Sequence, residues 1–353
     1  MPVLALLALA GTWGRDPGVV VVVVVAVVLA GAVLAAVHHA EVVAHRVGEP
    51  FGSLVLAVAV TVIEVALIVT LMVSGGPESA SLARDTVFAA LMITTTGIVG
   101  LSLMVGAQRF HTTLFNAEGS GAALATVTTL AALSLVLPTF TTSQPGPEFS
   151  PAQLIFAALA SLALYVMFVL TQTVRHRDFF LPVSQEGQRE QEDCDEHAAP
   201  PSSREALISL GLLLVSLVAV VGLAKVESPA IESAVAAVGF PPSFVGVVIA
   251  LLVLLPETLA AVRAARRGRI QTSLNLAYGS AMASIGLTIP TIALASIWLD
   301  GPLVLGLGST QIVVLILTVV VSVLTIVPGR ATRLQGGVHL VLLAAFLFLA
   351  VSP

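Results

Sequence analysis

A single glutamate interrupts a long aliphatic stretch of this sequence. Glu64 lies in TVIEVALIV, residues 61–69, and no other charged residue occurs within about a dozen positions on either side. A charged carboxylate at the centre of a hydrocarbon layer costs at least about 2.5 kcal/mol, so such residues are rare and usually functional. We therefore expect Glu64 to have a use and a partner.

Glu257 is the partner that the sequence offers. It follows Pro256 in VLLPETL, and of the twenty acidic residues only Glu64 and Glu257 fall well inside a long apolar segment. Two facing carboxylates suit a divalent cation such as Ca²⁺, which takes six to eight oxygen ligands at about 2.3–2.6 Å. Backbone carbonyls freed by Pro256, hydroxyls, amides and water would supply the other ligands. The alternative is that each glutamate is neutral, hydrogen-bonded and structural.

The same two carboxylates can also bind protons. Without a metal, burial and mutual repulsion favour the protonated form of at least one of them. Because the same atoms cannot hold Ca²⁺ and protons together, competition at one site that opens alternately to each face of a membrane gives antiport. Two glutamates also suit one monovalent ion plus one proton, so Na⁺/H⁺ or K⁺/H⁺ exchange is the alternative to Ca²⁺/H⁺ exchange.

The composition places this chemistry in a membrane. The chain has 353 residues, of which 57% are hydrophobic and 10% charged, and its mean hydropathy is +1.05. Soluble domains carry about 25% charged residues. We therefore predict an all-α, multi-pass protein of the cell membrane. The single cysteine, Cys194, excludes an internal disulfide and a multi-cysteine metal site.

Ten segments are long and apolar enough to cross a hydrocarbon core of about 30 Å as helices. Their continuous apolar runs lack the alternation of a membrane barrel. The predicted segments are 18–37, 51–74, 86–107, 120–141, 151–174, 206–226, 242–262, 272–298, 303–327 and 334–352. Residues 3–12 are too short to span alone and are expected to form part of an eleventh, partial amino-terminal helix.

Basic residues fall mainly on one side of these segments. The rich side has twelve: Arg46, Arg109, Arg175, Arg177, Arg189, Arg204, Arg263, Arg266, Arg267, Arg269, Arg330 and Arg333. The other side has only Arg15, Arg84 and Lys225. By the positive-inside rule, the arginine-rich side is cytoplasmic.

A polar linker, residues 175–205, separates five segments from five. Because five is odd, the second half must enter the membrane from the opposite face, as in inverted-repeat transporters. We predict an amino-terminal segment (1–17), a first five-helix repeat (18–174), the cytoplasmic linker and a second five-helix repeat (206–353).

The two halves also align weakly with each other. Glu64 aligns with Glu257 when FGSLVLAVAVTVIE (51–64) is written above FVGVVIALLVLLPE (244–257). VGLSLMV (99–105) over IGLTIPT (285–291) places Gly100 over Gly286. Aliphatic matches arise easily by chance, so the paired glutamates carry the case for two inverted repeats.

Three segments make the chain similar to bacterial calcium/proton antiporters of the cation/calcium exchanger superfamily. They are HHAEVVAHRVGEPFGSLVLAVAVTVIEVALIV (38–69), RDTVFAALMITTTGIVGLSLMVG (84–106) and LLPETLAAVRAARRGRIQTSLNLAYGSAMASIGLTIP (254–290). They resemble the first and second alpha-repeat regions of that family. The likeness extends loosely from about residue 18 to the end of the chain.

The resemblance implies export of cytoplasmic Ca²⁺ in exchange for external protons at Glu64 and Glu257, although some relatives exchange Na⁺ or K⁺. It also implies that the helices at 86–107 and 272–298 complete the site. The metal ligands implied are Glu64, Glu257, Asn275 and Ser280, and the supporting residues are Thr61, Thr94, Thr95, Thr96, Pro256, Gly279, Asp85 and Glu49. The sequence departs from the family in two respects. A complete extra amino-terminal helix is not expected, and Ala89 stands in the first repeat at the position that Asn275 occupies in the second.

Several smaller signals have a functional and a plainer interpretation. EQEDCDEH (190–197) could collect Ca²⁺ or be a solvated tether, and it lacks the spacing of an EF-hand. The Arg84–Asp85 pair could form an external gate or simply favour a helix amino terminus. The histidines around Glu41 and Glu49 (His38, His39 and His45) could tune activity with pH or be ordinary interfacial residues. RAARRGR (263–269) is expected to touch anionic lipid rather than nucleic acid.

Two other classes of function fit less well. An intramembrane enzyme would need a nucleophile–base pair or metal ligands at membrane depth, and no histidine or cysteine is expected deep in any span, since His339 only starts the last one. A passive channel would conduct without a pH gradient, and the predicted repeats argue against it. We predict no bound cofactor, only transported Ca²⁺ and protons.

Overall fold

Helices make up nearly all of the computed structural model, which describes residues 1–15, 18–48, 51–74, 80–183, 201–298 and 301–352. The first part contains α1 (Pro2–Thr12), α2 (Val19–Val47) and α3 (Phe51–Ser74). Next come α4 (Leu82–Met92), η2 (Ile93–Ile98), α5 (Val99–Phe110), α6 (Ala117–Ala131), η3 (Ala132–Val136), α7 (Leu137–Phe140), α8 (Pro151–Leu170), η4 (Thr171–Arg175) and η5 (Arg177–Phe180). The last part contains α10 (Ser203–Ala237), α11 (Phe244–Arg266), α12 (Ile270–Ala295), α13 (Ser309–Ile326) and α14 (Arg333–Val351). Two short antiparallel strands, β1 (Thr113–Leu114) and β2 (Arg330–Ala331), join two loops.

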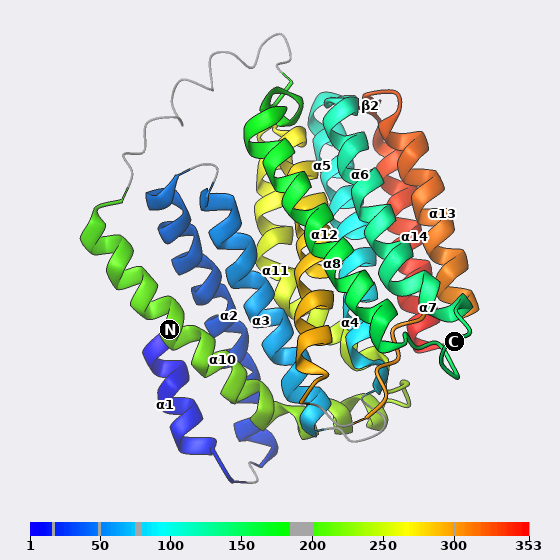
Figure 1. The fold of residues 1–353 in the computed structure, drawn as a ribbon. Helices are drawn as coiled ribbons and strands as arrows, with labels where there is room; N and C mark the ends of the chain where they lie inside the picture. The colour runs from blue at the N-terminus through cyan, green and yellow to red at the C-terminus, as the bar shows by residue number, and fades with distance from the viewer. Residues whose placement is uncertain (16–17, 49–50, 75–79, 184–200, 299–300, 353) are drawn as a thin grey trace.

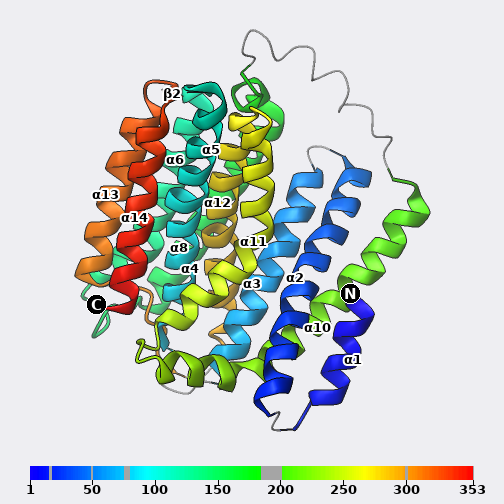
Figure 2. The same ribbon diagram turned by 180° about the vertical axis from the view of Figure 1, so that it is seen from behind.

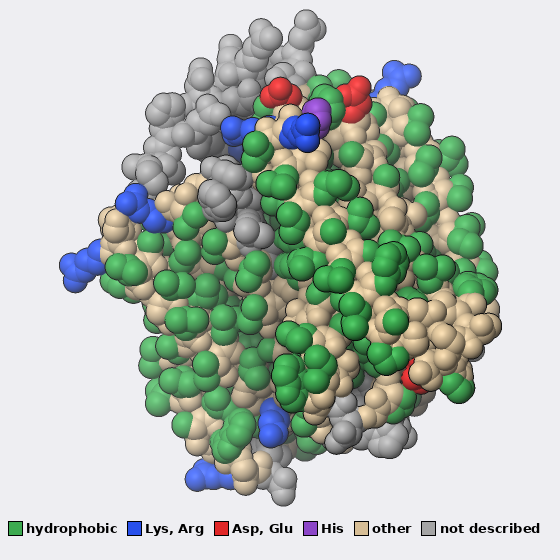
Figure 3. Space-filling model, viewed as in Figure 1, with side chains coloured by type: hydrophobic (Ala, Val, Ile, Leu, Met, Phe, Trp, Pro, Cys, Tyr) green, Lys and Arg blue, Asp and Glu red, His purple; other side chains and the backbone are tan. Residues whose placement is uncertain are grey.

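The all-helical, membrane-spanning prediction is confirmed. Nine helices of the described chain are long and apolar enough to cross a bilayer, and α3 adds a further apolar helix of 24 residues. Each of the ten predicted segments coincides with a helix, and residues 3–12 lie in the short helix α1. Hydrophobic side chains are spread over the middle of the face in Figure 3, and Lys and Arg lie toward its upper and lower ends and at its left edge.

Three boundaries differ from the predictions by six residues or more. The segment predicted at 18–37 is too short, because α2 continues to Val47. The segment predicted at 206–226 is wrong at its carboxyl end, because α10 continues through Pro229 to Ala237 and so includes Glu227. The segment predicted at 303–327 begins too early, because α13 starts only at Ser309. Gly306 lies against α7, where an added Cβ would be 2.5 Å from Thr139 Oγ1, so residues 303–308 approach α7 as extended chain.

The helices form two unequal groups (Figures 1 and 2). α1, α2 and α10 stand together on one side, α3 lies between the groups, and α4–α8 and α11–α14 form the larger body. α10 packs on α2, α1 and α3, whereas α12 packs on α3, α6, α8 and α11. We call the end that carries Arg175, Arg267 and Arg330 the arginine-rich end; α3 begins there and α11 ends there.

Two apolar cores hold these groups together. One is centred on α4, η2, α5 and α12, and the other joins α2, α3, α10 and the first half of α11. α11 therefore contributes to both cores. It approaches α4 most closely at Gly246, where an added Cβ would lie 2.8 Å from the backbone nitrogen of Thr86.

We expect Gly246→Val to destabilise the protein by about 1–3 kcal/mol, because overpacking would force α11 away from the α4 backbone. Its midpoint of thermal unfolding in detergent should fall well below that of the wild type. Gly211→Val is the matched control, since Gly211 is exposed on α10 and an added Cβ would meet nothing within 4 Å. Equal midpoints for the two variants would contradict this account of the α4–α11 contact.

Candidate functional site

The two glutamates singled out by the sequence lie on neighbouring helices. Glu64 is on α3 and Glu257 on α11, and each lies thirteen residues after the first residue of its helix. Because α3 and α11 begin at opposite ends of the protein, both carboxylates lie near mid-depth. Glu64 is 3% exposed and Glu257 8% exposed, and the two side chains interact electrostatically.

α12 contacts both of these helices and supplies a hydroxyl to the pair. Ser284 Oγ donates a hydrogen bond of 2.8 Å to Oε2 of Glu64. The other oxygen of Glu64 and Oε2 of Glu257 are buried and have no hydrogen-bond partner in the described structure. Each carboxylate therefore has an uncommitted oxygen, and that of Glu64 is in addition oriented by a hydrogen bond from a neighbouring helix.

Ser284 is a residue of this site that the sequence did not reveal. The alignment of the halves at residues 99–105 and 285–291 places Ser284 over Ile98, so no matching residue drew attention to it. Its spacing of four from Ser280 was the available signal, because residues four apart share a face of a helix.

The predicted ligands on α12 divide between two places. Asn275 Nδ2 donates to the carbonyl of Phe180 at 2.7 Å, and its Oδ1 accepts from Gln271 at 2.8 Å. Asn275 thus holds η5 at the arginine-rich end. Gly279 and Ser280 are half-buried one turn before Ser284, and a Cβ added to Gly279 would meet nothing within 4 Å. Open space therefore adjoins α12 on the arginine-rich side of Ser284.

The predicted threonines are all buried. The hydroxyls of the three in η2, Thr94, Thr95 and Thr96, donate to backbone carbonyls of residues 90–92 in the preceding turn. Thr61 is 5% exposed and lies about one turn from Glu64 on α3. In this conformation the η2 hydroxyls are committed to their own helix rather than directed to a shared ligand.

Pro256 lies inside α11 without interrupting it. α11 is continuous from Phe244 to Arg266 and Pro256 is buried within it. A proline has no N–H to donate to the carbonyl four residues before it. The carbonyl of Leu252 therefore loses its usual helical donor one turn from Glu257, without a change in the course of the helix.

Apolar side chains pack on the arginine-poor side of the two glutamates. We call five of them the apolar seal: Leu67 and Leu71 of α3, Leu223 of α10, and Ile249 and Val253 of α11, all members of one larger buried cluster. On α3 and α11 these residues lie in the turns between each glutamate and the arginine-poor end of its helix.

The opposite side of the site is more polar. The exposed Glu41 of α2 lies within electrostatic reach of Glu257. Open space adjoins Gly279 on this side as well. The predicted mouth residue Glu49 and the acidic stretch 190–197 lie outside the described residues.

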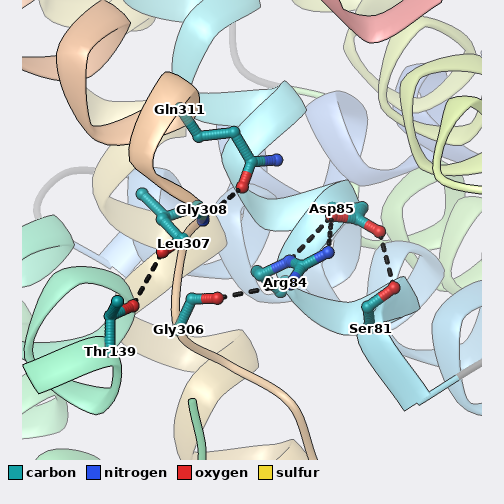
Figure 4. Close-up of polar contacts among 8 residues, drawn as sticks. All are labelled: Ser81, Arg84, Asp85, Thr139, Gly306, Leu307, Gly308 and Gln311. Atoms are coloured by element: carbon teal, nitrogen blue, oxygen red, sulfur yellow. Dashed lines mark hydrogen bonds and ion pairs between the residues drawn. The ribbon is translucent and has the colours of Figure 1, made fainter. Parts of the chain in front are cut away.

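Asp85 belongs to a polar cluster at the arginine-poor end (Figure 4). Its carboxylate accepts hydrogen bonds of 2.8 Å from Ser81 Oγ and from Arg84 Nε. Arg84 also donates to the carbonyl of Gly306 at 3.3 Å, and Thr139 holds the next carbonyl, that of Leu307, at 2.7 Å. The pair thus ties α4 to the extended chain before α13, beside a cavity of about 320 Å³.

The expectation that no histidine lies deep in a span is wrong for His339. This residue is completely buried on α14. Its Nδ1 lies 3.1 Å from the carbonyl oxygen of Thr95 in η2, and its Nε2 lies 3.2 Å from Thr325 Oγ1 on α13. Its position near the start of α14 did not predict burial, which arises because α5 and α13 cover that part of the helix.

The arrangement can bind positive charge at mid-depth. Two buried carboxylates with uncommitted oxygens must be neutralised by a cation or by protons, since an unpaired buried charge is costly. A cation with oxygen ligands and protons would compete for the same atoms.

Sequence comparison places the chain among known transporters. The profile described as sodium/calcium exchanger protein matches residues 17–174 and 208–352. The protein y4hA of Sinorhizobium fredii, named as an ionic transporter, is 45% identical over 355 residues, which cover 99% of this chain and 94% of the relative. The sodium-potassium/proton antiporter ChaA of Escherichia coli is 35% identical over 350 residues, which cover 98% of this chain and 93% of the relative.

Solved structures share the fold. Native YfkE matches with a TM-score of 0.72 at 16% identity, over 99% of this chain and 96% of that chain. The H⁺/Ca²⁺ exchanger CAX matches with a TM-score of 0.71 at 16% identity, over 98% of this chain and 85% of that chain.

We expect Arg84→Gln to lower the midpoint of thermal unfolding, because it leaves the carboxylate of Asp85, 3% exposed, without its cation. Breaking a buried ion pair in this way costs about 3–5 kcal/mol. The double variant Arg84→Gln/Asp85→Asn removes both charges and should recover part of the loss. Equal midpoints for the single and double variants would show that the ion pair contributes little.

Proposed function

This chain belongs to the sodium/calcium exchanger family, whose members are transporters rather than enzymes, and we propose that it exchanges cytoplasmic cations for external protons. The cation and the protons bind in turn at Glu64 and Glu257. The proton gradient drives cation export when the site opens alternately to the two faces of the cell membrane. The observation that carries the proposal is the pair of buried, electrostatically coupled carboxylates at mid-depth.

The proposal includes two inverted five-helix repeats, residues 18–174 and 206–353, joined by the linker 175–205. Corresponding contacts between the two halves support the repeats. α3 of the first repeat contacts α12 of the second, and α11 of the second repeat contacts α4 of the first. The family profile also matches two separate segments, residues 17–174 and 208–352, whose limits are close to those of the two proposed repeats. Inverted repeats would place the two glutamates at equivalent depths from opposite faces.

The structure corresponds in this proposal to a state open toward the cytoplasm. The apolar seal separates the glutamates from the arginine-poor end, and open space adjoins Gly279 on the other side. We assign the arginine-rich end to the cytoplasm by the positive-inside rule. The Arg84–Asp85 pair would then belong to the external gate.

Ca²⁺ is the cation that we propose first, because two carboxylates neutralise one divalent ion. The fold shared with an H⁺/Ca²⁺ exchanger is consistent with this choice. Na⁺ or K⁺ is the second candidate, favoured by 35% identity to a sodium-potassium/proton antiporter over nearly the whole chain. In that case one glutamate would bind the ion while the other keeps a proton.

Everted membrane vesicles test the function directly. Adding CaCl₂, NaCl or KCl to vesicles with a respiratory pH gradient should collapse that gradient, with Ca²⁺ acting at the lowest concentration. Glu64→Gln or Glu257→Gln should abolish the response to every cation, because each removes a carboxylate of the site. Glu118→Gln, an exposed glutamate on α6, is the matched control.

Either of two outcomes would contradict the proposal. Wild-type vesicles that respond to none of the three salts would refute cation/proton exchange. Full activity of either glutamine variant would refute the site.

Ser284→Ala should raise the cation concentration that gives half-maximal exchange by about tenfold or more. The hydroxyl stabilises the carboxylate of Glu64, and a hydrogen bond to a charged group contributes about 1.5–3 kcal/mol. Ser273→Ala is the control, because Ser273 is buried on the same helix but bonds to Ser102. An equal change in the two variants would indicate a general effect on α12 rather than on the site.

A further inference from the structure

A third acidic side chain is buried within a membrane-spanning helix. Glu227 lies on α10, ten residues before its end, and is 2% exposed. Its Oε1 has no hydrogen-bond partner among the described residues. The sequence analysis placed Glu227 just outside a span because the predicted segment ended at residue 226.

Glu227 lies toward the arginine-poor end of the protein. It follows the first residue of α10, Ser203, by 24 positions, which is about 36 Å along a helix that runs at an incline toward the arginine-poor end (Figure 1). Leu223, one turn earlier on α10, belongs to the apolar seal. Glu227 and Glu64 therefore lie on opposite sides of that seal.

The polar groups next to Glu227 in the sequence are engaged elsewhere. Lys225 is exposed, and its Nζ lies 5.4 Å from the centre of the Trp13 ring. Ser228 Oγ donates to the exposed Glu232 at 2.9 Å. Charged residues are absent from the segments packed nearby, residues 2–12 of α1, 19–37 of α2, 65–74 of α3 and 244–256 of α11.

Glu227 continues a line of polar residues along one face of α10. Ser209, Ser216 and Glu227 are separated by seven and eleven residues, spacings that return to the same side of a helix. All three are buried, and Ser209 Oγ lies 3.4 Å from Nδ1 of His39 on α2. This face therefore turns toward α2, and Glu227 is its outermost member.

The surroundings of Glu227 suit a proton better than a metal ion. Ca²⁺ takes six to eight oxygen ligands, and the described residues contain no cluster of three or more His, Cys, Asp or Glu side chains that could hold a metal. An isolated carboxylate in apolar surroundings is stabilised when it is protonated.

We infer that Glu227 is a proton-binding site on the external side of the apolar seal, which receives protons before they reach Glu64 and Glu257. A hydronium ion gives its proton to the Glu227 carboxylate and leaves as water. When the seal opens, the proton passes to the ionised carboxylate of Glu64 and the Glu227 carboxylate is regenerated. This role rests on the proposed cation/proton exchange.

Transport at varied lumenal pH tests the inference, because the lumen of an everted vesicle corresponds to the outside of the cell. Glu227→Gln should lower the exchange rate about tenfold or more and flatten its dependence on lumenal pH. The concentration of added cation that gives half-maximal exchange at the cytoplasmic face, which is the outer face of an everted vesicle, should stay within about twofold of the wild-type value. Glu227→Asp, which retains an acid, should restore the pH dependence, and Glu232→Gln on the same helix should behave as wild type.

A chemical readout tests Glu227 without transport. Dicyclohexylcarbodiimide modifies protonated carboxyl groups in apolar surroundings, so mass spectrometry of the purified wild-type protein should find Glu227 modified, to a smaller extent as pH rises. A Glu227→Gln protein that matches the wild type at every lumenal pH, or a Glu227 that is never modified, would overturn the inference. Failure of the Glu227 inference would leave the proposed exchange function intact, provided that the wild type is active and Glu64→Gln is inactive in the same assay. A wild-type protein that responds to no cation would instead contradict the exchange function itself.

Discussion

The cost of a charged carboxylate away from water is the constraint on which this protein depends. Glu64 and Glu257 are almost completely buried, and each has an oxygen without a hydrogen-bond partner among the described residues. Such a group must be neutralised by a proton or a cation, or it must be exposed to water. Two such groups at mid-depth therefore favour the binding of positive charge there.

The surrounding helices make the two carboxylates unequal. α12 reaches both glutamate helices but gives its hydroxyl, that of Ser284, only to Glu64. Glu257 lies one turn from a carbonyl that Pro256 deprives of its usual donor. The two glutamates therefore have different polar neighbours.

Packing also gives the site a direction. The apolar seal joins α3, α10 and α11 on one side of the glutamates, whereas half-buried Gly279 and Ser280 adjoin open space on the other. α10 belongs to the smaller helix group that stands beside the main body (Figures 1 and 2).

The sequence by itself determined the membrane-spanning helices, their approximate limits and the two central glutamates, because the length of an apolar segment and a charged residue inside it are both local features of the chain. The family resemblance added ligands by position, and Asn275 illustrates why position is insufficient: its amide is used to hold Phe180 at the arginine-rich end. Only the tertiary structure brought Ser284 to Glu64, buried His339 against η2 and enclosed Glu227 on α10. Those contacts depend on which helices cross and which faces they share, and residues more than two hundred positions apart, such as Glu64 and Ser284, show no periodicity that reveals their pairing.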